Sequence, residues 1–203
     1  DRTLMSKIRI GIFGGTFNPP HIGHIKAAEA FQRTVMPDRL LIMPDFLPPH
    51  KDSSEVASAE DRKQMCNLAF SHIKNSEISD YEIKKGGKSY TSVTLKSFYE
   101  DGRELYFLCG TDMFLTLESW FDFETIFKLA VICCVRREND PLNDTKLEQA
   151  KKEYTEKYAA KIIDIPISVT EVSSTEIREE IRKTSECKML PESIIEYINE
   201  KGL

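Results

Sequence analysis

The segment from Gly14 to His24 holds residues whose types and spacing suit phosphate binding. Gly14 and Gly15 carry no Cβ, so backbone N–H groups there can come close to an anion. His21 and His24 stand three residues apart, so both imidazoles can point to one side of a helix start and donate hydrogen bonds to phosphate oxygens. The helix N-terminus adds unsatisfied N–H donors and the positive end of its dipole. The segment therefore predicts a phosphate-binding turn.

Other phosphate motifs and metal sites fit this segment less well. The turn is no Walker loop, because no Gly-Lys-Ser/Thr follows, and no dinucleotide fingerprint, because the third glycine of Gly-x-Gly-x-x-Gly is missing. The two histidines could instead bind zinc, which would need further ligands at suitable spacing. The only other histidines are His50 and His72, so we expect no metal site built from protein ligands.

A second segment, from Ser173 to Arg178, has residue types that are typical of a helix start. Ser173 and Glu176 can form a capping box, so a well-started helix is the simplest interpretation. Arg178 falls in the first turn, where its guanidinium and the helix dipole could jointly bind phosphate groups. We expect Ile177 and Ile181 to form the buried face of this helix and to direct Arg178 elsewhere.

The elements that position these residues alternate between strand and helix patterns. Ile8, Ile10 and Ile12 alternate with polar or small residues, as in a strand, and apolar residues from Gly23 to Val35 follow helical spacing. Further strands are expected at Leu40–Met43, Ile78–Ile83, Leu105–Leu108, Val131–Val135 and Ile162–Ile167. Further helices are expected after Ser58, at Thr91–Glu100 and Thr145–Ala159, and from near Ser174 and Pro191.

This order of elements predicts an α/β fold of the Rossmann-like type. Parallel strands need crossover connections, which are right-handed and usually helical. We therefore expect a doubly wound, largely parallel sheet with helices on both faces and a small C-terminal helical portion. We expect a single domain over residues 5–203, because no linker or repeat interrupts the pattern. Residues 1–4, ahead of Met5, are expected to be a cloning remnant.

Composition limits the class of protein. Of the 203 residues 40% are hydrophobic and 30% charged, and no apolar run approaches the ~20 residues of a membrane-spanning helix. The chain starts without the apolar stretch of a secretory signal, so we expect a cytoplasmic protein with no membrane partner. A formal net charge of -5 argues against nucleic acid as a partner. The five cysteines lack Cys-x-x-Cys spacing, which favours reduced, buried thiols.

His21-Ile22-Gly23-His24 resembles the His-x-Gly-His signature of a nucleotidyltransferase family that shares it with class I aminoacyl-tRNA synthetases. The segment from Val172 to Arg178 is similar to the Ile-Ser-Ser-Thr-x-Ile-Arg motif of that family, with Val in place of the first Ile. In the family the two histidines contact the triphosphate and stabilise charge around the α-phosphorus during an in-line displacement. The resemblance implies no covalent enzyme intermediate.

Three segments in the middle of the chain resemble the nicotinate-nucleotide adenylyltransferases of this family. They are Pro48-Pro49-His50-Lys51, Lys88-Ser89-Tyr90-Thr91-Ser92, and Gly110-Thr111-Asp112 with Trp120 downstream. An indole face such as that of Trp120 can stack on a flat heteroaromatic ring. Asp112 can accept hydrogen bonds from ribose hydroxyls or the base, or help to orient Mg²⁺. Alone, Trp120 could be a core residue, Asp112 a turn residue and Lys51 a solvated charge.

The resemblance implies transfer of AMP from ATP to nicotinate mononucleotide, giving nicotinate adenine dinucleotide and pyrophosphate in NAD biosynthesis. The implied catalytic residues are His21, His24 and Arg178. The implied ATP-binding residues are Gly14, Gly15, Thr16, Phe17, His21, His24, Asp112, Ser173, Ser174, Thr175 and Arg178. The implied acceptor-binding residues are Asn18, Lys51, Ser89, Tyr90, Thr91 and Trp120. Mg²⁺ is expected to enter with ATP and to bridge its phosphate oxygens.

Two other functions stay open at this point. A pantetheine-phosphate adenylyltransferase shares both phosphate motifs but would not need the segments around Ser89 and Trp120. A non-catalytic nucleotide sensor would not need both histidines directed at phosphate. Arg62 falls where the family carries an arginine before a methionine, yet its place in a helix favours an exposed charge. The preference for the acid over the amide acceptor stays open, as does the possible assembly into a homo-oligomer.

Overall fold

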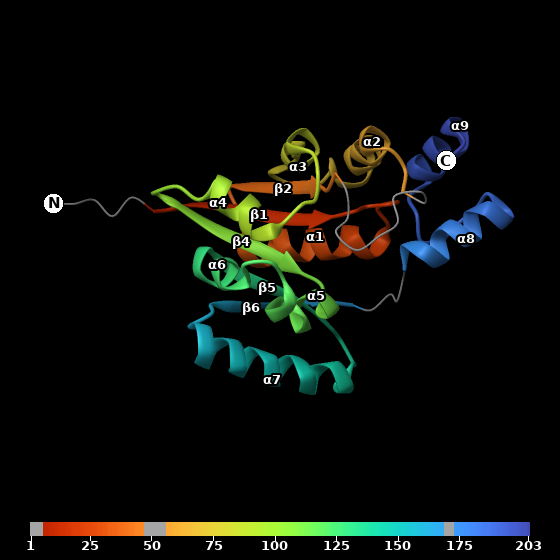
Figure 1. Cartoon of the computed structure of the whole chain (residues 1–203). Coiled ribbons are helices and arrows are strands. Elements are labelled where there is room, and N and C mark those ends of the chain that lie inside the picture. The colour runs from red at the N-terminus through yellow and green to blue at the C-terminus, as the bar shows by residue number, and fades with distance from the viewer. Residues whose placement is uncertain (1–5, 47–55, 169–172) are drawn as a thin grey trace.

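The computed structural model describes residues 6–46, 56–168 and 173–203, and within them six strands form one sheet. The strands are β1 (Ile8–Gly15), β2 (Arg39–Pro44), β3 (Ser76–Ile78), β4 (Arg103–Cys109), β5 (Ala130–Arg137) and β6 (Ile162–Ile167). All neighbouring strands are parallel, in the order β3-β2-β1-β4-β5-β6 (Figure 1). This is the order of a doubly wound Rossmann-like sheet, so the predicted fold class is confirmed.

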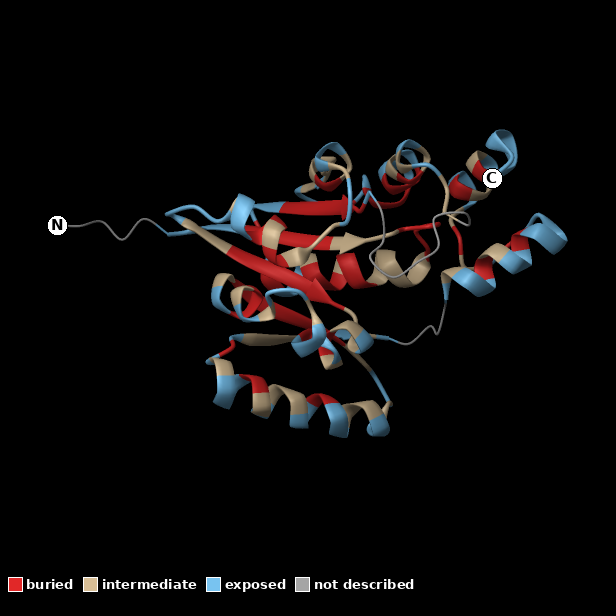
Figure 2. Ribbon diagram, viewed as in Figure 1, coloured by how far each residue is buried: buried red, intermediate tan, exposed pale blue. Residues whose placement is uncertain are grey.

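Helices connect the strands and follow the last one. They are α1 (Ile22–Val35), α2 (Ala59–Phe70), α3 (Tyr81–Lys85), α4 (Thr91–Phe98), α5 (Thr111–Leu115), α6 (Phe123–Leu129), α7 (Pro141–Tyr158), α8 (Ser174–Thr184) and α9 (Glu192–Lys201), with a 3₁₀ turn, η2, at Leu117–Ser119. The central strands β1, β2, β4 and β5 contain long buried runs, as expected for a parallel sheet covered on both faces (Figure 2).

Side chains on the two faces of the sheet pack into two separate cores. Successive residues of a strand point to opposite faces, so Leu40 and Ile42 of β2 join one core while Leu41 and Met43 join the other. The first core contains side chains of α1, α2, α8 and α9. The second contains side chains of α4, α5, η2, α6 and α7. The C-terminal helices therefore complete the same layer as α1, the helix that follows β1.

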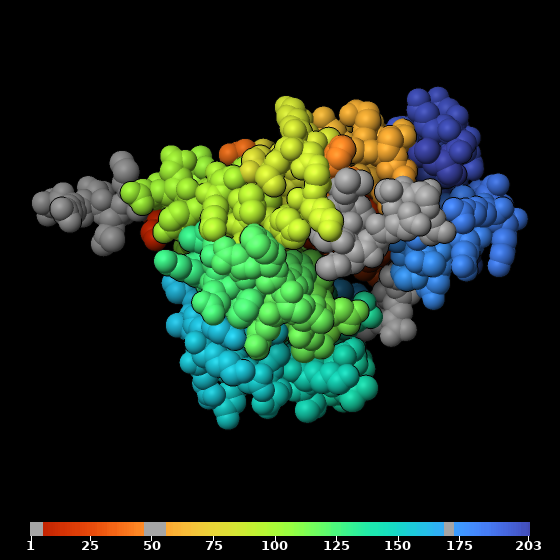
Figure 3. Space-filling model, in the orientation of Figure 1, coloured from red at the N-terminus to blue at the C-terminus, as the bar shows by residue number. Residues whose placement is uncertain are grey.

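The C-terminal helices are held close to the start of α2. The hydroxyl of Tyr197 on α9 donates a hydrogen bond of 2.7 Å to Asp61 of α2. In the space-filling view α9, in dark blue, lies against the orange segment of α2 (Figure 3). Ile177 and Ile181 of α8 are buried, as the sequence predicted, with exposed fractions of 1% and 8%.

Local predictions were wrong at two places. The strand expected at Ile78–Ile83 stops at Ile78, and Tyr81–Lys85 forms α3, where the Asp80 carboxylate pairs with Lys84 across one helical turn. The helix expected from Thr145 begins at Pro141, because Asp140 caps it and proline fits the first turn. The short elements α5, η2 and α6 were not expected at all, since none is long enough to show a period.

Candidate active site

A cavity of about 970 Å³ opens at the carboxyl ends of β1, β2, β4 and β5. Within the sheet, β2 and β3 lie on one side of β1, whereas β4, β5 and β6 lie on its other side. Such a switch point leaves a crevice between the loops that leave the strands in opposite directions, and ligands of open α/β sheets bind there. The predicted phosphate turn, which follows β1, lies at this switch point.

The glycine turn lies over a cluster of aromatic rings. Phe17 is 2% exposed, and its ring makes edge contacts with Phe13 and Phe70. A Cβ added to Gly15 would lie 3.1 Å from the Phe17 ring, so the glycine lets the backbone pass close to this ring. The backbone of Phe17 is itself left-handed, with φ of 50°. The turn is therefore fixed by packing from below, which leaves its upper side to line the cavity.

His21 and His24 form a reciprocal cap at the start of α1. Nδ1 of His24 accepts the backbone N–H of His21 at 3.1 Å, and Nδ1 of His21 accepts the backbone N–H of His24 at 3.4 Å. The two rings stack with centroids 3.7 Å apart. This is a capping box in which imidazoles take the usual places of Ser/Thr and Glu/Gln. Both histidines line the cavity.

The cap also determines where each imidazole proton lies. A ring nitrogen that accepts a hydrogen bond carries no proton, so each neutral ring has its proton on Nε2. Burial lowers the pKa of His21 from 6.5 to about 4, which keeps this ring neutral near pH 7. A neutral His21 ring with its N–H on Nε2 can donate a hydrogen bond to an anionic oxygen without a positive charge.

Gly23 is required by the position of the His21 ring. A Cβ at Gly23 would lie 2.9 Å from Cε1 and 3.0 Å from Nδ1 of His21. This close approach to the His21 ring explains why position 23 is a glycine. The glycine of the His-x-Gly-His signature thus has a steric reason in this chain.

The structure brings the late serine-rich segment to the glycine turn. Arg178 donates from Nη1 to the backbone oxygen of Asn18 at 2.7 Å, and Ser174 donates to the backbone oxygen of Pro19 at 3.5 Å. Ser173 caps α8 by accepting the backbone N–H of Glu176. Ser174 lines the cavity, whereas Ser173, Thr175 and Arg178 are not among its lining residues. Arg178 also donates to the hydroxyl of Thr175 at 3.3 Å.

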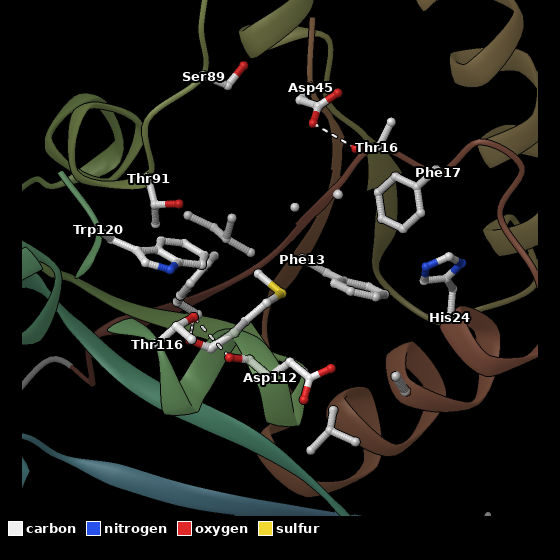
Figure 4. Close-up of a pocket in the computed structure, with 18 of the residues that line it drawn as sticks. Phe13, Thr16, Phe17, His24, Asp45, Ser89, Thr91, Asp112, Thr116 and Trp120 are labelled. Atoms are coloured by element: carbon white, nitrogen blue, oxygen red, sulfur yellow. Dashed lines mark hydrogen bonds between the residues drawn. The ribbon is translucent and has the colours of Figure 1, made fainter. Parts of the chain in front are cut away.

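Two of the predicted acceptor residues, Thr91 and Trp120, lie across the cavity from His24. Figure 4 shows Thr91 and Trp120 on one side, His24 on the other, and Asp45 and Asp112 at two further edges. Tyr90 and Ser89 line the same cavity. Lys51 lies outside the described residues, as does the rest of the Pro48–Lys51 segment.

Trp120 is half-buried, and its ring makes an edge contact with Phe107, with the ring centroids 6.3 Å apart. Its neighbour Phe121 is 60% exposed and packs against Tyr90 with ring centroids 4.9 Å apart. Asn18 also lines the cavity, but its side-chain oxygen accepts the backbone N–H of Ala57 at 3.1 Å. The amide of Asn18 therefore ties the glycine turn to the segment before α2.

Sequence reasoning missed three charged residues that line the cavity, Asp45, Glu82 and Arg137, and named a fourth, Lys88, only as part of the acceptor segment. Asp45 follows β2 and Arg137 ends β5, so the rule that ligands bind beyond the carboxyl ends of strands could have found both. Glu82 was hidden by the wrong strand prediction. Its carboxylate accepts a hydrogen bond from the Thr94 hydroxyl at 2.9 Å, and burial raises its pKa.

The prediction for Arg62 was wrong. It was expected to be an exposed helix charge, yet it is 1% exposed. Its position could have been read from the helix period, because Met65, Cys66 and Ala69 follow at three, four and seven residues and are all buried. Because Arg62 is charged, its position on the buried face of α2 was overlooked.

Within residues 6–46, 56–168 and 173–203, no group of three or more His, Cys, Asp or Glu side chains could hold a metal ion. No helix in those ranges is long and apolar enough to cross a membrane. The five cysteines are buried and unpaired, as the sequence predicted, and burial raises the pKa of Cys66 and Cys109.

Comparison with known proteins gives consistent matches. The cytidylyltransferase-like family model matches residues 12–180. A probable nicotinate-nucleotide adenylyltransferase of Caldicellulosiruptor saccharolyticus is 36% identical over 197 residues, covering 97% of this chain and 98% of that protein. One from Clostridium tetani is 36% identical over 195 residues, covering 95% and 96%. The solved Plasmodium falciparum nicotinic acid mononucleotide adenylyltransferase complexed with APC has a TM-score of 0.71 at 17% identity, covers 96% of each chain, and shows the same fold.

Proposed function

The chain belongs to the cytidylyltransferase-like nucleotidyltransferases and, among them, to the nicotinate-nucleotide adenylyltransferases, and from this premise we propose that it transfers AMP from ATP to nicotinate mononucleotide. The products are nicotinate adenine dinucleotide and pyrophosphate. The observation that carries the proposal is a single cavity of about 970 Å³ lined by both histidines and by the Ser89–Thr91 segment with Trp120. We also propose that residues 5–203 act as one nucleotidyltransferase domain.

The reaction is an in-line displacement at the α-phosphorus of ATP. A phosphate oxygen of the acceptor forms the new bond to phosphorus, and the bond to the bridging oxygen of pyrophosphate breaks, so no enzyme group is modified. Such transfers depend mainly on positioning and on donors preorganised around developing charge. The Nε2–H groups of His21 and His24 are the donors, because their Nδ1 atoms are already engaged in the helix cap.

The remaining phosphate oxygens are held from the other side of the turn. Gly14–Phe17 line the cavity, and we assign their backbone N–H groups to these phosphate oxygens. Arg178 lies beside them, anchored to Asn18, and a guanidinium has further donors for the β- and γ-phosphates. The start of α8, with Ser173, Ser174 and Thr175, adds free N–H groups and the positive end of a helix dipole. Asp112 accepts hydrogen bonds from ribose or base.

The acceptor occupies the opposite side of the cavity. The indole of Trp120 stacks on the pyridine ring, and its contact with Phe107 holds its orientation. Ser89, Tyr90 and Thr91 offer hydroxyl and backbone donors to the pyridine carboxylate at the start of α4. Asn18 and Lys51 are also assigned to the acceptor.

Mg²⁺ fits this site as an ion that enters with ATP. Magnesium in nucleotide sites takes one or two carboxylates and completes its shell with phosphate oxygens and water. Asp112 lines the cavity, and the ion that enters with ATP would be the alternative partner of its carboxylate. When bound, the ion neutralises phosphate charge.

The test is pyrophosphate release with ATP and three acceptors: nicotinate mononucleotide, nicotinamide mononucleotide and pantetheine phosphate. We expect the highest kcat/KM with nicotinate mononucleotide. Efficient turnover of pantetheine phosphate alone would identify the other adenylyltransferase, and binding of ATP without turnover of any acceptor would identify a sensor. In either case the proposed function is wrong.

Trp120→Ala separates the acceptor side from the ATP side in the same assay. Loss of stacking should raise KM for the acceptor by about tenfold, since a stacked ring contributes about 1–3 kcal/mol. KM for ATP should stay within about twofold, because Trp120 lies across the cavity from His24 (Figure 4). A selective loss of ATP affinity would contradict the assignment.

A further inference from the structure

Arg62 is a buried guanidinium that joins three parts of the chain at the back of the cavity. Its Nη1 donates to the backbone oxygens of Thr16 at 2.9 Å and Asp45 at 2.8 Å, and its Nη2 donates to the backbone oxygen of Phe46 at 3.1 Å. Its Nε donates to the backbone oxygen of Ala57 at 3.0 Å. One side chain therefore ties the glycine turn after β1 to the end of β2 and to the start of α2.

A second connection runs through a carboxylate. Arg62 forms an ion pair with Asp45 at 3.2 Å, and the other carboxylate oxygen of Asp45 accepts the Thr16 hydroxyl at 3.0 Å (Figure 4). Thr16 is thus held twice, by its backbone oxygen and by its side chain. Thr16 and Asp45 line the cavity, whereas Arg62 lies behind them.

The hydrogen bond to Thr16 has a directional consequence for the next residue. In a trans peptide the C=O of one residue and the N–H of the next point in opposite directions. Because Arg62 holds the Thr16 oxygen, the N–H of Phe17 is directed away from Arg62. Phe17 lines the cavity, where the proposed function places the phosphate groups.

We propose that Arg62 is a positioning residue for the transfer reaction, which fixes the Thr16–Phe17 peptide so that its N–H faces the bound nucleotide. The inference rests on the proposed function for the reaction and on the hydrogen bonds of Arg62 for the mechanism. A planar guanidinium with five donors can hold these four backbone oxygens, whereas the ammonium of lysine is a compact point charge on a flexible stem.

The test is Arg62→Lys, which keeps the charge and loses the fork. The matched control is Arg39→Lys, because Arg39 also makes a two-point contact, with Glu77, but is exposed and lies at the other end of β2. Each variant is examined for thermal unfolding, for the stoichiometry and Kd of a non-hydrolysable ATP analogue, and for kcat and KM with both substrates.

We expect Arg62→Lys to bind the analogue with stoichiometry near one, to weaken its Kd severalfold and to lower kcat by about tenfold or more, since small displacements of reacting groups have effects of this size. Arg39→Lys should stay within about twofold of the parent. A merely structural role for Arg62 would reduce the active fraction and leave Kd and KM unchanged.

Several outcomes would overturn the inference. They are full activity of Arg62→Lys, or a loss of kcat that matches its loss of binding stoichiometry while KM is unchanged. If the lysine variant unfolds, the neutral Arg62→Gln replaces it with the same expected results, and failure of both to fold would make Arg62 a folding residue only. Lack of turnover by the parent enzyme would refute the proposed function, while weaker analogue binding by Arg62→Lys would still support the role of Arg62.

Discussion

His21 performs two tasks, and the first of them needs the ring to be neutral. Its Nδ1 accepts a backbone N–H of α1, and its Nε2–H is the proposed phosphate donor. A proton on Nδ1 would break the cap and place a charge in a position that is 6% exposed. Desolvation disfavours the charged imidazole, which is why burial lowers its pKa to about 4.

This lowered pKa predicts how stability depends on pH. Between 6.5, the ordinary value, and about 4, the unfolded chain binds more protons at His21 than the folded chain does. The stabilisation is therefore complete above pH 6.5 and is lost as the pH falls towards 4, with an upper limit of about 3 kcal/mol. Denaturant unfolding of the parent and of His21→Asn across this range measures it.

Asparagine is a suitable replacement because it caps helices and does not titrate. The free energy of unfolding should fall less steeply with decreasing pH in His21→Asn than in the parent. Parallel pH profiles for the two proteins would show that the ring has an ordinary pKa, and would remove the argument for a neutral donor.

The residues of the site were only partly predictable. The glycines and both histidines could be assigned from local spacing, because a turn and a helix start are local structures. Glu82 and Arg62 could not, because their roles depend on contacts with segments far along the chain. For Arg62 the charge suggested solvent, although its position in the period of α2 was that of a buried residue.

At the scale of elements, the start of α1 depends on a contact between Gly23 and the His21 ring. Alanine is favoured over glycine in a helix by about 1 kcal/mol, so Gly23→Ala should stabilise α1 on propensity alone. The added Cβ would instead lie 2.9 Å from Cε1 of His21, and one of the two must move. We expect the ring to be displaced from its cap, with kcat lowered about tenfold or more.

The measurement compares kcat and the unfolding midpoint of Gly23→Ala with those of Thr34→Ala, an exposed position on the same helix. Thr34→Ala should leave kcat within about twofold, because it changes propensity without touching the cap. A more stable Gly23→Ala protein with full activity would mean that the ring and the helix start tolerate the added carbon.

The elements differ in how well the sequence predicted them. Strands β1, β2, β4, β5 and β6 show continuous or alternating apolar runs and were expected close to their observed bounds. The edge strand β3 has three residues, and its apolar neighbours belong to α3, so the pattern there was ambiguous. Short helices such as α5 and α6 carry too few residues for a helical period.

At the scale of the whole molecule, the parallel sheet explains why distant segments form one site. Every strand ends at the same edge, so the loops after β1, β2, β4 and β5 converge on one cavity. The order of the elements predicted the parallel sheet. That the start of α8 meets the glycine turn followed only from the resemblance to the family, because the contacts of Arg178 with Asn18 and of Ser174 with Pro19 span most of the chain.

The most direct measurement is a crystal structure with a non-hydrolysable ATP analogue and nicotinate mononucleotide bound together. We expect the triphosphate between the two imidazoles and the start of α8, with Nε2 of His21 and His24 and the guanidinium of Arg178 within hydrogen-bonding distance of its oxygens, and the pyridine ring against Trp120. A triphosphate bound away from either the glycine turn or Arg178 would contradict the account.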